Sequence, residues 1–254
     1  MPILSVDTVS KRFGGLDALK DVSFSLHEGQ IKALIGPNGA GKTTLFNLIS
    51  GMDRPTSGHI RFAGKDLGRL APHHASRLGI GRTFQHSKVF DDMSVLDNVK
   101  VGRHAKTRAG LLSAFFTLPR HRRDERAITE DALRALRRVG LEERAAEPAG
   151  GLPMGERHLL EIARALASEP RVLLLDEPAA GLNNEETDRL ADSVRRIRDE
   201  GVTVLLVEHD MGFVMNISDE VVVLDYGRKI AEGPPLMIQN DEDVIRAYLG
   251  EDLG

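Results

Sequence analysis

The predicted strands follow the arrangement of hydrophobic positions along the chain. Residues 172–175 and 202–207 are almost wholly apolar, which is typical of parallel strands buried on both faces of a sheet. Residues 22–26 alternate apolar and polar side chains, as a strand with one face in solvent does. Shorter strands are expected at 4–8, 30–35 and 59–62, and a hairpin at 221–230. We therefore predict an α/β fold with a mostly parallel sheet and a small antiparallel β region near the N-terminus.

The remaining patterned segments are predicted to be helical. Helices are expected at 44–49, 184–200 and 241–249. The pattern from 94 to 167 is also helical and contains no convincing strand. We expect the 254 residues to form a single domain, with its α/β core at 1–90 and 167–254 and a helical subdomain at 91–166.

Residues 36–43 read Gly-Pro-Asn-Gly-Ala-Gly-Lys-Thr, and they fit the phosphate-loop pattern without a gap. Glycines let successive N–H groups converge on one anion, and the N-terminus of the following helix adds partial positive charge. Lys42 would reach the β- and γ-phosphates, and the Thr43 hydroxyl would hold Mg²⁺. The residues predicted to bind the nucleotide are Gly36, Pro37, Asn38, Gly39, Ala40, Gly41, Lys42, Thr43 and Thr44. The sequence therefore predicts a nucleoside triphosphate, with Mg²⁺, as ligand.

Two carboxylates follow the apolar strand at 172–175. If this strand lies beside the strand of the phosphate loop, Asp176 would hold the Mg²⁺ shell. Glu177 would then point past the γ-phosphate and could polarise the attacking water. Pro178 ends the strand and redirects the chain. This second motif extends the prediction from nucleotide binding to hydrolysis.

Composition narrows the classes of function. No cysteine is present, which excludes disulfides and thiolate metal sites. No apolar run approaches the length of a membrane span, and the N-terminus lacks the pattern of a secretory signal. The net charge of −4 argues against a dedicated nucleic-acid binder, so no nucleic-acid partner is expected.

Residues 100–126 are strongly basic and surround a short apolar stretch at 111–116. One interpretation is a solvated basic face with a small local core. The other is contact with a partner at a membrane surface, where basic side chains meet anionic head groups. The sequence leaves both open.

Five further motifs, in order, resemble the ATP-binding subunits of ABC transporters. They are Phe13, Thr83-Phe84-Gln85, residues 152–166, Asp176-Glu177-Pro178 followed by Gly181-Leu182-Asn183, and Val207-Glu208-His209-Asp210. The resemblance covers essentially the whole chain. It implies a P-loop NTPase with a RecA-like core and a helical subdomain, using ATP and Mg²⁺ as cofactors and acting as an ATPase.

The resemblance also implies roles for individual residues. Phe13 would stack on adenine, and Gln85 would contact Mg²⁺ or the lytic water and report the nucleotide state to a partner. His209 would hydrogen-bond the γ-phosphate and orient the water. In this family two ATP molecules lie between two subunits, and a signature sequence of one subunit caps the ATP held by the other. The matching residues here are Leu152, Pro153, Met154, Gly155 and Glu156.

The signature departs from the family's Leu-Ser-Gly-Gly-Gln. Pro153 replaces the serine and offers neither a hydroxyl nor an N–H, and Asn183 replaces an aspartate. Gly155 keeps backbone approach to a phosphate open. We therefore expect an asymmetric heterodimer in which the site capped by this chain is the weaker one, with a homodimer as the alternative.

Several strings resemble one branch of the family, the importers of branched-chain amino acids that use two ATPases. These are residues 13–16, 79–85, 177–183 and 244–250. The insert at 111–123 also resembles the larger ATPase of that branch, in which a non-serine at the second signature position occurs as well. The branch implies a second ATPase subunit, two integral-membrane permeases, an extracytoplasmic solute-binding protein and a peripheral position at the cytoplasmic face of the inner or plasma membrane.

Other classes remain as alternatives. Urea and other amide importers share the same architecture, and the ATPase of a lipopolysaccharide exporter has a similar pattern. ABC ATPases linked to nucleic acids carry a long coiled coil or a second ATPase domain, and this chain shows neither. Kinases and GTPases with a phosphate loop lack the later motifs in this order, and no N-K-x-D guanine motif is found.

Overall fold

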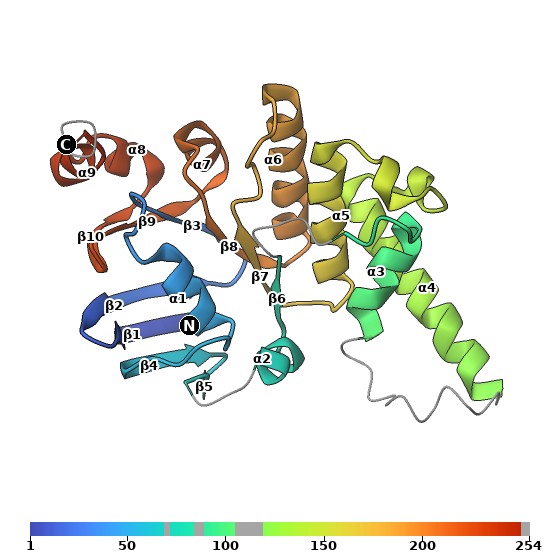
Figure 1. The fold of residues 1–254 in the computed structure, drawn as a ribbon, viewed down its shortest axis with the longest axis horizontal. Helices are drawn as coiled ribbons and strands as arrows, with labels where there is room; N and C mark the ends of the chain where they lie inside the picture. Colours follow the sequence, from blue (N-terminus) through green and yellow to red (C-terminus); the bar gives the residue numbers. More distant parts are fainter. Residues whose placement is uncertain (69–71, 84–88, 105–118, 250–254) are drawn as a thin grey trace.

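The computed structural model describes residues 1–68, 72–83, 89–104 and 119–249. The two β-sheets and their helices occupy one part of the molecule, and helices α3, α4 and α5 form the other end (Figure 1). In the described ranges, no helix combines the length and the hydrophobicity that crossing a membrane requires.

The central sheet has six strands in the order β10-β9-β3-β8-β7-β6. Their bounds are β3 Ile31–Ile35, β6 Ile80–Arg82, β7 Val172–Asp176, β8 Thr203–Val207, β9 Glu220–Asp225 and β10 Arg228–Gly233. All neighbouring pairs are parallel except the β9–β10 hairpin. Val207 is in register with both Leu34 and Asp176. The carboxyl ends of β3, β8 and β7 therefore lie side by side at one edge of the sheet.

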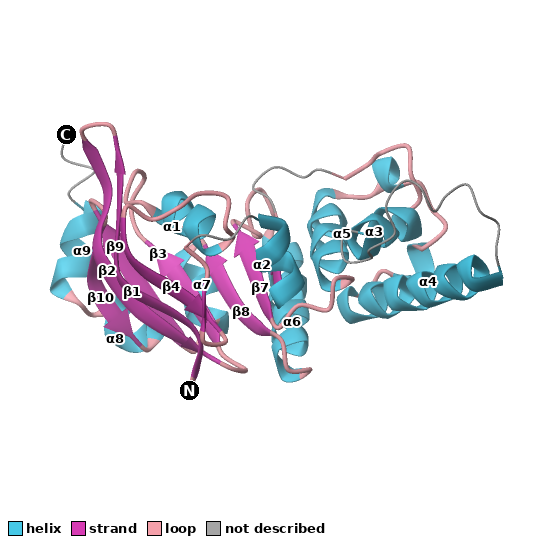
Figure 2. Ribbon diagram, turned by 90° about the horizontal axis from the view of Figure 1, so that it is seen from below, coloured by secondary structure: helices cyan, strands magenta, loops and turns pink. Residues whose placement is uncertain are grey.

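A second sheet is antiparallel, with strand order β2-β1-β4-β5. Its strands are β1 Pro2–Phe13, β2 Leu16–His27, β4 Ser57–Phe62 and β5 Lys65–Asp66. The alternating pattern expected at 22–26 is present, because Val22, Phe24 and Leu26 are buried while Ser23 and Ser25 are partly exposed. Figure 2 shows this sheet at the end of the molecule opposite α3 to α5.

Helices cover both sheets and build the helical end. They are α1 Lys42–Ile49, α2 Pro72–Leu78, α3 Val95–His104, α4 Pro119–Val139, α5 Met154–Leu166, α6 Asn184–Asp199, α7 Met211–Ile217, α8 Pro235–Gln239 and α9 Glu242–Leu249. The start of α6 is fixed by a capping box, in which Asn183 accepts from the Glu186 N–H and Glu186 accepts from the Asn183 N–H. This pair of bonds sets the direction in which the chain leaves the loop after β7.

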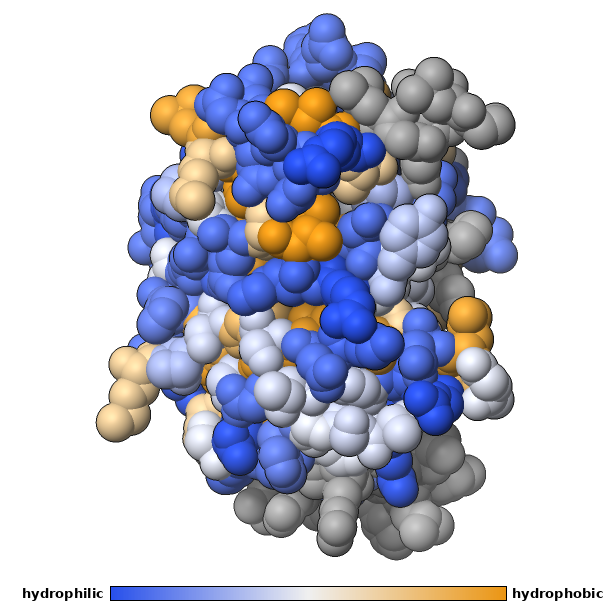
Figure 3. Space-filling view, turned by 90° about the vertical axis from the view of Figure 1, so that its left-hand side faces the viewer, coloured by the Kyte–Doolittle hydropathy of each residue, from blue (hydrophilic) through white to orange (hydrophobic). Residues whose placement is uncertain are grey.

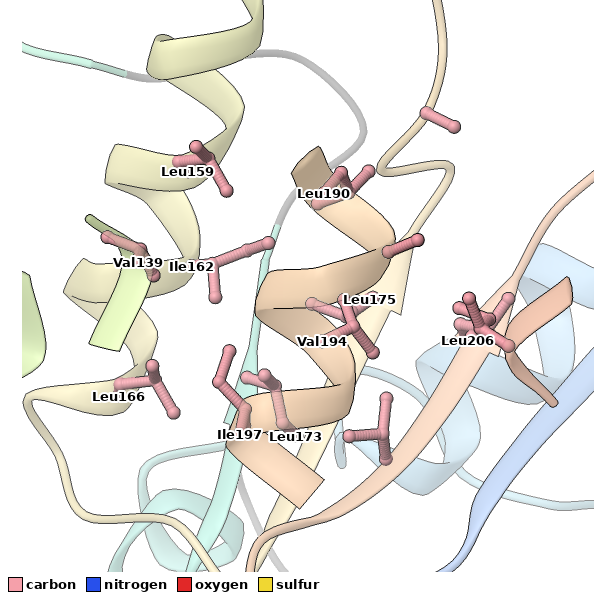
Figure 4. Packing of buried hydrophobic residues seen from close by; sticks show 14 of the residues in the cluster. Val139, Leu159, Ile162, Leu166, Leu173, Leu175, Leu190, Val194, Ile197 and Leu206 are labelled. Carbon is pink, nitrogen blue, oxygen red and sulfur yellow. The ribbon is translucent and has the colours of Figure 1, made fainter. Parts of the chain in front are cut away.

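The parallel sheet separates two hydrophobic clusters. Leu173, Leu175 and Leu206 belong to the cluster on the face of α5 and α6. Figure 4 shows Leu173 and Leu175 beside Ile197 and Val194 of α6. Leu174 and Leu205 point to the other face, where α1 and the antiparallel sheet lie. Successive residues of one strand serve opposite faces, which explains why 172–175 and 204–207 are apolar throughout.

The predicted fold class is confirmed: the sheet is mostly parallel, and the antiparallel sheet is near the N-terminus. The expected strands at 4–8 and 22–26 are parts of longer strands. The sequence pattern missed the short elements β5, β6, α2, α7 and α8, which are too short to show a clear period. Part of the basic segment, residues 105–118, lies outside the described residues.

The face that carries α8 and α9 is mostly hydrophilic and is interrupted by small, separate apolar patches (Figure 3). Leu236, Met237 and Ile245 of these helices are exposed. Single exposed apolar side chains are ordinary on protein surfaces, so this face gives no indication of a large hydrophobic interface.

A matched pair of leucine truncations tests which surfaces hold the fold together. Leu206→Ala removes a fully buried side chain from β8 and should lower the free energy of unfolding by about 2–5 kcal/mol. Leu236→Ala, at a side chain that is 76% exposed, should change it by less than about 0.5 kcal/mol. Urea denaturation of both variants measures the difference, and equal losses would contradict the assignment of the core.

Candidate functional site

The phosphate-loop residues leave β3 at Ile35 and enter α1 at Lys42. The Lys42 ammonium donates to the backbone carbonyls of Gly36 and Pro37, the latter at 2.8 Å. The side chain is therefore folded back over the loop and is only 8% exposed. The Thr43 side chain at the start of the same helix is exposed.

Two glycines are required by the path of this loop. Gly36 has φ +148°, and a Cβ there would lie 2.1 Å from the carbonyl oxygen of Leu224. Gly41 has φ +101°, and a Cβ there would lie 2.7 Å from the carbonyl oxygen of Ala18. Any larger residue would push the loop away from β9 and β2. The glycines thus keep the loop backbone close to its neighbours, in the tight path that a phosphate-binding loop requires.

The two predicted carboxylates lie at the end of β7 in different environments: Asp176 is its last residue and Glu177 follows it. Asp176 is 4% exposed, and its Oδ2 accepts from Arg82 at 2.9 Å. Its Oδ1 is buried and has no hydrogen-bond partner among the residues that the structure describes. Glu177 adopts φ +49° and donates its N–H to the Val207 carbonyl at 2.9 Å. A left-handed conformation is unfavourable for glutamate, and here that hydrogen bond anchors it to β8.

His209 follows β8 and reaches Glu177. Its Nδ1 lies 4.0 Å from the Glu177 Oε2, and the imidazole side chain is 62% exposed. The structure therefore brings together the two side chains expected to handle the water. Gln85, the third residue expected at this point, lies outside the described residues.

Glu208 is a site residue whose importance the sequence pattern did not indicate. Its side chain is fully buried, and its carboxylate accepts from the N–H groups of Ala179 at 2.7 Å, His209 at 3.1 Å and Asp210 at 3.5 Å. Burial raises the pKa of Glu208, and these three backbone bonds oppose the rise. The carboxylate ties the loop after Glu177 to the segment that carries His209. A glutamate following an apolar strand gives no sign of burial, so only the structure identifies it.

The signature-like residues lie in the helical part of the molecule. Pro153 is the N-cap of α5 and makes no side-chain cap bond. Gly155 donates its N–H to Glu186 at 3.4 Å, and Met154 is 56% exposed. Helix α5 packs on α3 and α4. Residues 152–156 are therefore held by elements other than those that hold the phosphate loop.

Phe13 ends β1 and is 50% exposed. The Lys11 ammonium lies 4.7 Å from the centroid of its ring. An exposed ring is compatible with the predicted stacking on a base, and it is not a core side chain.

The residues present fit a nucleotide with Mg²⁺. Glycines shape the loop and Lys42 supplies a cation at it. The buried Asp176 Oδ1 is a carboxylate oxygen to which no described residue donates a hydrogen bond. Among the residues that the structure describes, no cluster of three or more His, Asp or Glu side chains could hold a metal ion. That is expected of Mg²⁺, which is usually bound by one or two protein groups together with phosphates and water.

Comparison with known proteins gives concordant matches. A family model described as ABC transporter matches residues 19–180, and one described as branched-chain amino acid ATP-binding cassette transporter matches residues 228–253. Over 251 residues, the chain is 46% identical to the high-affinity branched-chain amino acid transport ATP-binding protein BraF of Pseudomonas aeruginosa. It is 44% identical to LivG of Escherichia coli, which carries the same description, and each alignment covers 98% of both chains.

Two solved structures share the fold. The ADP conformation of an ATP-binding cassette of an ABC transporter superposes with a TM-score of 0.87 at 32% identity. A nucleotide-free ATP-binding cassette from an ABC transporter gives 0.86 at 32% identity. Both cover 98% of this chain and 99% of the other.

The raised pKa of Glu208 predicts a pH dependence of stability. A carboxyl with a raised pKa in the folded state contributes stability that is fully present below its ordinary pKa of 4.5 and is lost as pH rises through the folded value. Wild type should therefore lose stability relative to the non-titrating Glu208→Gln as pH rises above that ordinary value. Denaturant unfolding of both proteins across this range measures the difference, and a pH-independent difference would contradict the effect of burial.

Proposed function

This chain belongs to the ABC transporter family of ATP-binding cassettes, whose activity is ATP hydrolysis, and we propose that it powers uptake of branched-chain or related amino acids through membrane permeases. The observation that carries the proposal is the near-full-length similarity to two ATPases named for that transport. It is supported by a site in which the loop, both carboxylates and His209 stand together at one sheet edge.

We assign the steps of hydrolysis to this chain's own residues. The loop N–H groups and Lys42 would bind the phosphates, while Thr43, the Asp176 Oδ1 and Gln85 would hold Mg²⁺. Bound Mg²⁺ would neutralise charge on the β- and γ-phosphates. Glu177 would accept a proton from the attacking water. His209, whose Nδ1 lies 4.0 Å from the Glu177 Oε2, would orient that water. Phe13 would stack on the adenine.

The permeases require a docking surface, and we propose a cleft between α2, α3 and α5. It has a volume of about 540 Å³, and its walls include Met52, Phe90, Val101, Arg82 and Arg164. Met52, Phe90 and Val101 are all exposed. A mostly apolar cleft with exposed aromatic and thioether side chains suits an apolar segment of a partner protein. We name this surface the docking cleft.

The second subunit follows from the separation of residues 152–156 from the phosphate loop. We propose that these residues cap an ATP bound to a partner ATPase, most simply in a heterodimer, with a homodimer as the alternative. Pro153 removes the hydroxyl donor, so the site that this chain caps would be the weaker of the two. The extracytoplasmic binding protein would act through the permeases, and this subunit would sit peripherally on the cytoplasmic face.

A different solute is the second candidate. The chain is also 37% identical to a ribose import ATP-binding protein of Streptomyces coelicolor, and spans 48% of that longer protein. ATPases of different importers are thus similar to this chain, and a urea or amide importer or a lipopolysaccharide exporter would need the same ATPase chemistry. In the proposed assembly this subunit would not contact the solute, so its transport partners would decide the substrate.

A conservative change at Glu177 tests both halves of the proposal. Glu177→Gln removes the base but keeps the shape of the side chain, so ATP binding should be retained while turnover falls by about 10²–10⁴-fold. In proteoliposomes containing the permeases and binding protein, leucine uptake should fall in parallel. Turnover at the wild-type rate would remove Glu177 as the base, and turnover without leucine uptake by wild type would redirect the search to another solute.

Substitution of Pro153 by serine tests the proposed asymmetry between the two ATP sites of the dimer. Pro153→Ser restores a hydroxyl at the N-cap of α5 and should raise the ATPase rate of the assembled complex by stabilising the capped phosphate. The stimulation should be absent for the isolated chain, in which no partner site is capped. An unchanged ATPase rate in the complex would remove the support for the proposal that the site capped by this chain is the weaker one.

A further inference from the structure

We propose that Arg82 is a positioning residue that orients the metal-binding carboxylate of Asp176 and links it to the docking cleft. The proposal rests on the proposed function, because it assigns the other oxygen of Asp176 to Mg²⁺. Arg82 is the last residue of β6, and it stands 94 positions before Asp176 in the chain. No motif of the sequence assigns it a role.

The contact with Asp176 divides the two carboxylate oxygens between two tasks. Arg82 Nη2 donates to Oδ2 at 2.9 Å, while the buried Oδ1 has no hydrogen-bond partner within the described part of the chain. The side chains are 11% and 1% exposed, respectively. A charge-assisted hydrogen bond between two side chains this buried holds the carboxylate in one orientation. Arg82 therefore fixes which oxygen would be left to hold Mg²⁺.

The same guanidinium also holds the helix of the phosphate loop. Arg82 Nη1 donates to the Asn47 Oδ1 at 2.8 Å and to the Ser50 Oγ at 2.7 Å. Its guanidinium carbon lies 5.6 Å from the centroid of the Phe46 ring. The planar fork of arginine allows these donors to act in two directions at once, which a lysine cannot reproduce. One side chain thus sets the distance between α1 and the end of β7.

Arg82 also belongs to the docking cleft. Arg82, Ser50 and Met52 all line it, and Nη1 lies 3.2 Å from the Met52 sulfur. A segment that packs on Met52 would press on the side chain that orients Asp176. The geometry therefore provides a direct physical connection between a docked permease and the metal site.

The first test measures metal-dependent nucleotide affinity rather than turnover. A fluorescent ATP analogue is titrated into the isolated chain with Mg²⁺ and with a chelator, for wild type, Arg82→Met and Arg82→Lys. Groups that orient a metal ligand typically contribute about 10–100-fold to metal affinity. We expect Arg82→Met to lose most of the Mg²⁺-dependent gain and Arg82→Lys to keep part of it.

The matched control is Arg103→Met, which removes an arginine from an ion pair with Asp131 at 2.7 Å in the helical part of the molecule. Its Mg²⁺-dependent gain should equal that of wild type. Thermal unfolding in the presence of the chelator identifies any variant that does not fold. If Arg82→Met does not fold, the affinity measured for Arg82→Lys decides the result. An undiminished or larger gain in the folded Arg82 variants would overturn the positioning role. A wild type that does not bind the analogue at all would instead overturn the proposed function.

The link to the cleft is tested in the assembled complex. The ratio of ATPase rates with and without the permeases should fall towards one in Arg82→Lys and stay at the wild-type ratio in Arg103→Met. Because the ratio cancels any loss of the basal ATPase rate, it reports only the effect of the permeases on ATP hydrolysis. An unchanged ratio in Arg82→Lys would overturn the proposed connection.

Discussion

The parallel register of three strands is the constraint on which the rest of the site depends. Val207 of β8 is paired with Leu34 of β3 and with Asp176 of β7. Because the three strands run in the same direction, the phosphate loop, the two carboxylates and His209 all emerge at one edge. The two hydrophobic clusters on the faces of the sheet resist any slip of this register, since a shift of one residue would turn buried leucines to the opposite face.

Each of the polar groups at that edge costs folding free energy by itself and is stabilised by its surroundings. Glu177 occupies a left-handed backbone conformation, Glu208 is a fully buried carboxylate, and Arg82 and Asp176 form a nearly dry ion pair. Each is balanced by specific hydrogen bonds, such as the three backbone N–H groups on Glu208. This arrangement fixes the carboxylate oxygens proposed to hold Mg²⁺ and to accept a proton from water before any ligand binds, so they need little reorganisation for the reaction.

The distribution of functional residues over the molecule explains why partners are part of the proposal. The residues assigned to ATP and Mg²⁺ come from the strand ends and α1, whereas residues 152–156 begin α5 in the helical part. The docking cleft lies between these parts, with walls from both. A segment bound in the cleft would therefore contact the ATP-binding part and the helical part together.

The sequence by itself determined the fold class, the phosphate loop and the order of the later motifs, because these depend on local patterns. Apolar runs at 172–175 and 202–207 identify buried strands, and the glycines at 36–41 identify a tight turn of the phosphate-loop pattern. Only the tertiary structure decided that Arg82 contacts Asp176 and that Glu208 is buried beneath the loop carrying Ala179. Those contacts join residues 94 and 29 positions apart. They are set by the parallel pairing of β6, β7 and β8. The hydrophobic period within a short segment does not indicate which strands are neighbours in the sheet.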